Sequence, residues 1–154
     1  MINYDSLLSD QVKQMQPSGI RKFFDVAAMM DGVISLGVGE PDFQTPWVVR
    51  KEAVDILERK RIIYSANSGM MNLRKEIANY LNRKYDLTYD PDSEVIATVG
   101  GSEAIDLAIR AIVNPGDEVL VVEPSFVCYK PIVELMHGVA IPISTQLKNK
   151  FKLT

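Results

Sequence analysis

The run from Glu94 to Ile143 constrains the fold more than any other part of the chain. It alternates short stretches rich in β-branched residues with stretches in which apolar residues recur at helical spacing. An order of strand, helix, strand, helix and strand predicts parallel strands joined by right-handed crossovers. The fold class is therefore α/β. The expected strands are Glu94–Thr98, the stretch EVLVVEP that begins at Glu118, and Val139–Ile143; the expected helices cover about 102–113 and 129–136.

Two of these elements contain little polar surface. The helix from Ser102 to Val113 is apolar on most of its faces, and the strand that begins at Glu118 is almost continuously apolar. Strands of this kind are typical of parallel sheets that are covered on both sides. We therefore expect both elements to be well buried.

The first ninety residues predict helices joined by irregular segments. Thr45 precedes Pro46 as an N-cap would precede a proline at the first helical position. The expected elements here are a helix over Ile20–Met30, a short strand over Val33–Leu36, a helix from Pro46 to about Arg59, an irregular segment over Tyr64–Gly69, a helix from Met71, and a turn at Asp90–Asp92.

Two consecutive glycines, Gly100 and Gly101, separate the first expected strand of the α/β run from its helix. The first turn of a helix has unpaired N–H groups and a partial positive charge, which together suit a phosphate. Ser102 adds a hydroxyl and is a candidate N-cap, whereas the carboxylate of Glu103 would repel an anion unless its side chain points away. A tight turn without a ligand explains the same glycines, so the residues alone leave both interpretations open.

Other glycine motifs do not explain this chain. A dinucleotide fingerprint would need a third glycine after Gly37 and Gly39, but Asp42 stands there. Neither Gly-Lys-Ser nor Gly-Lys-Thr occurs, so the phosphate loop of nucleotide hydrolases is not present in this sequence.

Composition narrows the class of protein further. The 154 residues are enough for about one domain, and the net charge of −3 argues against nucleic acid as a partner. Cys128 is the single cysteine, which excludes an internal disulfide and a zinc site of several thiolates; we expect it and the single histidine, His137, to be structural. No stretch has the length of a membrane span, and the polar N-terminus is unlike a signal peptide, so we expect a cytoplasmic protein without a membrane partner.

Three segments in the same order carry a family resemblance: ISLGVGEPDFQTP, YSANSGMMNLR and TVGGSEAIDLAIRAIVNPGDEVLVVEPSFVCY. From about Gly19 to Leu153 the chain resembles the first portion of a class I/II aminotransferase, a pyridoxal-phosphate enzyme of fold type I close to the aspartate and aromatic aminotransferases. The resemblance implies a three-layer α/β/α large domain, of which only the N-terminal part is present. It assigns residues 1–45 to the N-terminal arm and the start of the small domain, and 46–154 to the large domain.

The resemblance also implies which residues contact the cofactor, pyridoxal 5′-phosphate. Gly101 and Ser102 match the loop whose amides and hydroxyl bind the cofactor phosphate, and Glu103 follows just inside the helix. Phe126 matches the aromatic residue that stacks on the pyridine ring, as a flat π-system suits; its alternative role is core packing.

Two further positions concern the substrate and the dimer. Gly39 matches the glycine whose backbone lies beside the α-carboxylate of the substrate. Tyr64 matches the tyrosine that reaches across the interface of a homodimer to the cofactor phosphate of the partner; without the resemblance it reads as a loop aromatic.

The resemblance covers only the first part of such an enzyme. The family's Schiff-base lysine, its acid beside the pyridinium nitrogen and its substrate-binding arginine all come later in the chain, and Lys148, Lys150 and Lys152 are too early to match. The expected parent function is transamination between an L-amino acid and a 2-oxo acid, with no catalytic residue in these 154 residues and no activity of the fragment alone. The alternative is a non-catalytic, aminotransferase-like effector module of a transcriptional regulator.

The family's strand order has a consequence for this chain. The resemblance places the strand at Glu94–Thr98 on one side of the sheet and the two later strands together, with absent strands between them. A buried strand without neighbours leaves its backbone groups unpaired. Either the missing part is supplied in another form, or the chain pairs its strands differently or with a second copy.

Overall fold

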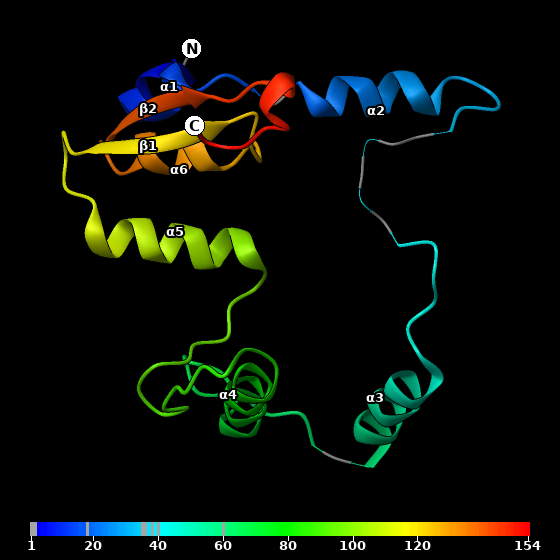
Figure 1. The fold of residues 1–154 in the computed structure, drawn as a ribbon. Coiled ribbons are helices and arrows are strands. Elements are labelled where there is room, and N and C mark those ends of the chain that lie inside the picture. Colours follow the sequence, from blue (N-terminus) through cyan, green and yellow to red (C-terminus); the bar gives the residue numbers. More distant parts are fainter. Residues whose placement is uncertain (1–2, 18, 35–36, 38, 40, 60) are drawn as a thin grey trace. The chain divides into compact units, whose positions relative to one another are not determined.

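The computed structural model describes residues 3–17, 19–34, 37, 39, 41–59 and 61–154, without the side chain of Arg21. The chain divides into two compact units. The sheet unit consists of Met1–Ser18 and Thr98–Thr154, and the helical unit consists of Gly19–Ala97. Figure 1 labels their elements.

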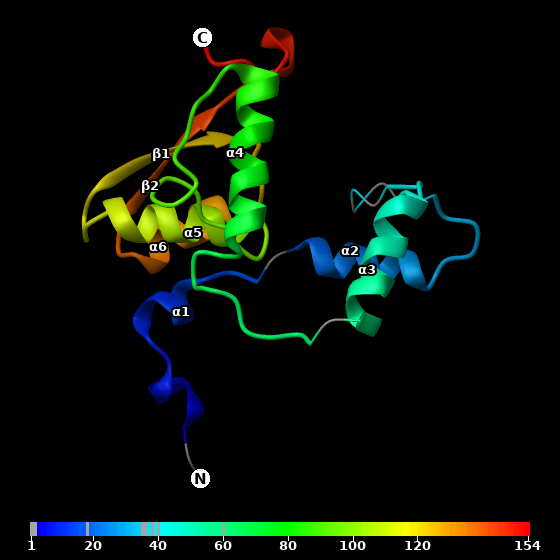
Figure 2. The ribbon, with the colours of Figure 1, turned by 90° about the horizontal axis from the view of Figure 1, so that it is seen from below.

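The sheet unit is built around one β-α-β motif. Strand β1 (Glu118–Glu123) pairs in parallel with β2 (Val139–Ser144), in a register that sets Glu118 opposite Val139 and Glu123 opposite Ser144. Helix α6 (Tyr129–Leu135) connects them and packs against both strands, and α5 (Gly101–Ile112) packs against α6. The parallel pairing and the positions of these elements confirm the prediction. Figure 2 shows the same unit from below.

Three short elements complete the sheet unit. They are η1 (Tyr4–Leu7), α1 (Asp10–Gln14) and η2 (Leu147–Asn149). Helix α1 packs against α6, and Nε2 of Gln11 lies 2.7 Å from Nδ1 of His137, just after α6. The N-terminal segment is thereby attached to the end of the crossover helix.

The core of the sheet unit lies between β1 and α6. Val121, Ile132 and Val133 are buried there, whereas Leu120, on the opposite face of β1, is 66% exposed. The predicted burial of β1 on both faces is therefore wrong. The predicted burial of α5 is also wrong, because none of its residues is buried. Both elements have the composition of a buried layer, but the described residues of the sheet unit cover only one face of its two strands.

The helical unit contains α2 (Ile20–Ala28), α3 (Trp47–Arg59) and α4 (Met71–Tyr85). These bounds confirm the three predicted helices to within two residues, the usual uncertainty of a helix end. The segment 61–66 is irregular, and a turn follows Asp90, as predicted. The predicted strand at Val33–Leu36 is absent at Val33 and Ile34, while Ser35 and Leu36 lie outside the described residues.

The predicted strand at Glu94–Thr98 does not form. Instead, Nη1 of the buried Arg74 donates to the backbone oxygens of Pro91 and Asp92 at 3.0 and 3.1 Å and to that of Val95 at 3.5 Å. The amide of Ala97 donates to the Ser68 oxygen at 3.0 Å. The prediction is wrong because a strand requires a neighbouring strand, and this segment obtains its hydrogen bonds from a helix and a loop.

Candidate functional site

The start of α5 has an unusual backbone. Gly100 is the N-cap, with φ 86° and ψ 167°, a conformation that only glycine adopts readily. Gly101 is the first helical residue, and a Cβ added there would meet no atom within 4 Å. The fold therefore explains the glycine at position 100, whereas no described residue of the sheet unit lies close enough to require one at position 101. The space in front of Gly101 is open, as an anion-binding loop would need.

Ser102 is not the N-cap, so that prediction is wrong. The cap residue is Gly100, which has no side chain to accept a hydrogen bond, and Ser102 is the second residue of the helix. Within the described part of the chain, the amides of Gly101, Ser102 and Glu103 have no protein acceptor. Such amides at a helix start, together with a nearby hydroxyl, are the groups that bind phosphate in many proteins.

The carboxylate of Glu103 accepts a hydrogen bond from the amide of Val99, on the chain that leads into the helix. This contact resembles a capping box, in which an acidic residue in the first turn satisfies an amide before the helix. It also places a negative charge beside the site. A phosphate here would add a second anionic group, so tight binding requires positive charge from outside this helix start.

The loop between β1 and α6 lies beside the same helix start. Sγ of Cys128 is 3.9 Å from Oγ of Ser102. Phe126, in the same loop, is 55% exposed and meets the ring of Tyr129 edge to face, at a centroid distance of 6.0 Å. Within this unit the ring is only partly covered, and its role stays a prediction. The structure thus brings Ser102 next to the loop that carries Phe126.

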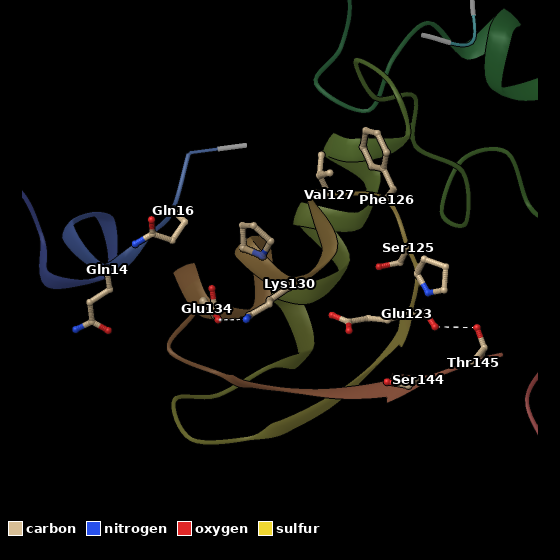
Figure 3. Close-up of a pocket in the computed structure, with 12 residues that line it drawn as sticks. Gln14, Gln16, Glu123, Ser125, Phe126, Val127, Lys130, Glu134, Ser144 and Thr145 are labelled. Atoms are coloured by element: carbon tan, nitrogen blue, oxygen red, sulfur yellow. Dashed lines mark hydrogen bonds and ion pairs between the residues drawn. The ribbon is translucent and has the colours of Figure 1, made fainter. Parts of the chain in front are cut away.

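A pocket of about 640 Å³ opens beside Phe126, at the carboxyl ends of β1 and β2 (Figure 3). Ligands of α/β proteins commonly bind at this end of parallel strands. Lys130 and Glu134 form an ion pair of 3.7 Å on its wall, and the Thr145 hydroxyl donates to the Glu123 oxygen at 2.7 Å. This polar wall was not among the sites expected from the sequence; the spacing of Lys130 and Glu134, four residues apart on one helix, was the available signal.

Gly39 and Tyr64 belong to the helical unit, so their roles stay predictions. The side chain of Tyr64 is fully exposed, at 102%, in the irregular segment after α3. A Cβ added at Gly39 would meet no atom within 4 Å. Both positions therefore have free space around them within their own unit.

Two further features of the described residues concern membranes and metal ions. No helix among them has the length and apolar character needed to cross a membrane. No group of three or more histidine, cysteine, aspartate or glutamate side chains comes together there in a way that suits a metal ion.

Comparison with known families decides the class of protein. The family model for aminotransferase class I and II matches residues 31–154. The chain belongs to this family. It is 55% identical over 149 residues to the putative aminotransferase YugH of Bacillus subtilis (strain 168), and this match covers 97% of the chain and 39% of YugH. It is 39% identical to an aspartate aminotransferase of Pyrococcus abyssi, over 95% of the chain and 38% of the relative.

Solved structures share the fold of this chain over nearly its whole length. The aspartate aminotransferase of Thermotoga maritima matches with a TM-score of 0.88 and 31% identity, over 96% of this chain and 40% of that one. A Pyrococcus structure described as protein-A1 matches with a TM-score of 0.89 and 36% identity, over 94% and 37%. The fold is thus part of fold type I. The chain spans about two-fifths of the length of the curated relatives it matches, 39% for YugH.

Proposed function

We propose that this chain, joined to the remainder of the family's fold, forms a transaminase that moves an amino group between an L-amino acid and a 2-oxo acid. The observation that carries the proposal is the start of α5. There, free amides and an open approach at Gly101 lie beside the loop that bears Phe126. Membership of the aminotransferase family supports the same reaction. Pyridoxal phosphate, when bound, supplies the electron sink for this chemistry.

The residues present suit the phosphate end of that cofactor. The amides of Gly101–Glu103 and the Ser102 hydroxyl would hold the phosphate, and the ring of Phe126 would fix the plane of the pyridine ring. Gly39 would contact the carboxylate of the substrate through its backbone. None of these groups transfers a proton, so the chain contributes binding and orientation.

The phosphate role is tested at Gly101 in a full-length enzyme that carries this segment. Gly101→Val adds a branched side chain in the space that the anion would enter, while the fold offers no atom for it to strike. We expect the dissociation constant for pyridoxal phosphate to rise more than tenfold, a loss of at least about 1.4 kcal/mol.

Gly19→Val is the matched control, because a Cβ at Gly19 also meets no atom within 4 Å and the residue also lies at the start of a helix, as the N-cap of α2. It should leave cofactor affinity unchanged. Equal affinity of the Gly101→Val variant and the unmodified enzyme would show that the glycines form a turn without a ligand.

We also propose that the full enzyme is a homodimer in which Tyr64 serves the active site of the partner. The match of YSANSG to the family and the full exposure of Tyr64 support this role. Mixing Tyr64→Phe enzyme with a variant that lacks the Schiff-base lysine should create hybrid dimers with one intact site. A mixture that never exceeds the summed activity of the two parents, each impaired alone, would rule out the role across the interface.

The 154 residues alone should have no transaminase activity. The reaction needs a lysine that exchanges with the substrate amine and then moves the α-proton, and no lysine of this chain matches it. The test incubates the purified chain with pyridoxal phosphate, an amino acid and 2-oxoglutarate, and follows glutamate formation against a cofactor-only control. Turnover above that control, retained after repurification, would contradict the proposal.

A further inference from the structure

The pocket of about 640 Å³ at the carboxyl ends of β1 and β2 has the size of a small-molecule site. Its lining comes from four parts of the sheet unit: the N-terminal segment, the ends of both strands, the loop 124–127 and helix α6. Gly101, Ser102 and Glu103 are not among the residues that line it. The phosphate contacts proposed above therefore give no role to the charged groups of this pocket.

Three charged side chains line the pocket, and their charges do not balance. Nζ of Lys130 lies 3.7 Å from Oε1 of Glu134, so this pair is close to neutral. The carboxylate of Glu123 has no hydrogen bond or ion pair with any described residue, and only the backbone oxygen of Glu123 accepts hydrogen bonds, from Thr145. Figure 3 shows the Glu123 side chain pointing from the end of β1 toward the wall that carries Lys130. The pocket thus holds one negative charge without a partner.

Much of the remaining lining is apolar. Phe126 and Val127, which are 55% and 47% exposed, form one apolar wall, and Pro124 and Pro131 extend it. The uncharged polar groups are those of Gln14, Gln16, Ser125, Ser144 and Thr145. The face of an aromatic ring attracts a cation, and apolar walls cover a hydrocarbon stem. An unpaired carboxylate beside such walls therefore favours a ligand that is both cationic and partly apolar.

We infer that this pocket binds an organic ammonium ion, a small molecule with a primary amino group on an apolar stem. The ammonium group pairs with the carboxylate of Glu123, and the stem covers Phe126 and the neighbouring proline rings. A carboxylate ligand fits less well, because Lys130 is already paired and Glu123 would repel a second anion. The inference concerns binding alone, so it stands or falls independently of the proposed transaminase activity.

The test titrates the 154-residue chain with three probes that share a phenylethyl group. They are phenethylammonium, 2-phenylethanol and 3-phenylpropionate, which carry a positive charge, no charge and a negative charge. We expect phenethylammonium to bind at least fivefold more tightly than either of the others. We also expect it to shift the amide NMR signals of 125–130, the loop and the first turn of α6 beside the pocket.

Two glutamates of one strand locate the contact. Glu123→Gln removes the unpaired charge and keeps the shape of the side chain. Glu118→Gln is the matched control, because Glu118 is the same residue type at the other end of β1 and outside the pocket. Glu123→Gln should raise the dissociation constant of phenethylammonium at least fivefold, and Glu118→Gln should change it less than twofold. Retained protection of the β1–β2 ladder against hydrogen exchange shows that each variant is folded.

A third variant should strengthen binding. Lys130→Gln removes the cation that competes for the carboxylates and releases Glu134 from its ion pair. We expect the dissociation constant of phenethylammonium to fall at least twofold, a gain that unfolding cannot produce.

Three results would overturn the inference. One is equal affinity for the three probes, or no binding of any, because the pocket would then not select a cation. Another is equal weakening by Glu123→Gln and Glu118→Gln, which would attribute binding to the net charge of the chain. The third is a set of shifted amide signals confined to residues outside the pocket.

Discussion

Two runs of similar composition, EVLVVE at 118–123 and EVIAT at 94–98, adopt different structures in this chain. The first becomes strand β1, because β2 supplies a parallel ladder and α6 buries Val121. The second stays irregular, and its backbone is held by the guanidinium of Arg74 and the oxygen of Ser68. Strand-forming residues thus allow a segment to become a strand, but it becomes one only where a neighbouring strand is available to pair with it.

The largest expected effect concerns Gly69, against which the irregular run packs. Gly69 has φ +93°, and a Cβ there would lie 2.6 Å from the Cβ of Ala97. Gly69→Ala combines backbone strain with a clash, so we expect it to lower the free energy of unfolding by about 3 kcal/mol. Chemical denaturation measures the loss, and Gly19→Ala, where nothing lies within 4 Å, should stay within about 0.5 kcal/mol. A tolerated Gly69→Ala would mean that the 94–98 segment is not fixed in its irregular conformation.

The second largest loss of stability is expected at Arg74, because its side chain donates the hydrogen bonds that a neighbouring strand would otherwise supply. Arg74→Met keeps the apolar stem but leaves the oxygens of Pro91 and Asp92 without their donor. Loss of charged hydrogen bonds at a buried site should cost about 2 kcal/mol, and hydrogen exchange at Ala97 should accelerate. Exchange at β1 serves as the internal control and should not change. If Ala97 exchanges at its original rate in the variant, Arg74 does not hold this segment.

Truncation within the two runs compares them directly. Val121→Ala removes methyl groups from a side chain that is 6% exposed, whereas Ile96→Ala removes more atoms from one that is 58% exposed. We expect a loss of about 1.5 kcal/mol for Val121→Ala and less than about 0.5 kcal/mol for Ile96→Ala. The shift of the denaturant midpoint, with the slope of the unfolding transition unchanged, gives the stability loss of each variant and thus their order. The reverse order would indicate that the irregular run contributes more to the fold than the strand.

The smallest effect is a change in the pKa of Asp90, whose turn leads into the irregular run. The hydrogen bond from Ser93 is the main cause that holds the Asp90 pKa below its ordinary value of 3.8, and the Asp92 amide adds to it. A lowered carboxyl pKa stabilises the fold above pH 3.8, and that contribution is lost as the pH falls through the lowered value. Ser93→Ala should therefore raise the Asp90 pKa toward 3.8, which a carboxyl NMR titration detects. An unchanged titration would assign the shift to the backbone donors alone.

The sequence predicted the parts of the fold that depend on local pattern. The three helices of the helical unit, the β-α-β motif and the start of α5 follow from apolar spacing, from the turn at 114–117 and from the glycine pair. The missing strand at 94–98 and the exposed face of β1 were not predictable in this way, since each depends on which other strands are present. The composition of a segment indicates which neighbouring elements it needs in order to be stable. The described part of this chain contains only some of those elements.

The same distinction between local pattern and tertiary surroundings applies to the candidate site. The helix start at Gly101 lies one residue from the start that the sequence predicts, because it depends on residues close together in the chain. The cofactor role of Phe126 stays a prediction. The N-cap at Gly100 rather than Ser102, and the contact of Glu103 with the Val99 amide, depend on backbone angles that the residue types do not determine. The roles of Gly39 and Tyr64 stay predictions.

The glutamates at both ends of β1 have a consequence for solubility. Glu118 and Glu123 enclose four consecutive apolar residues, Leu120 among them, whose side chain is open to solvent. Copies stacking in register along this strand would bring each glutamate against the same residue of the next copy at pH 7. Charges that flank an apolar strand in this way act as gatekeepers against fibre growth. The two glutamates therefore oppose self-association of the chain through β1 while one edge of that strand is unpaired.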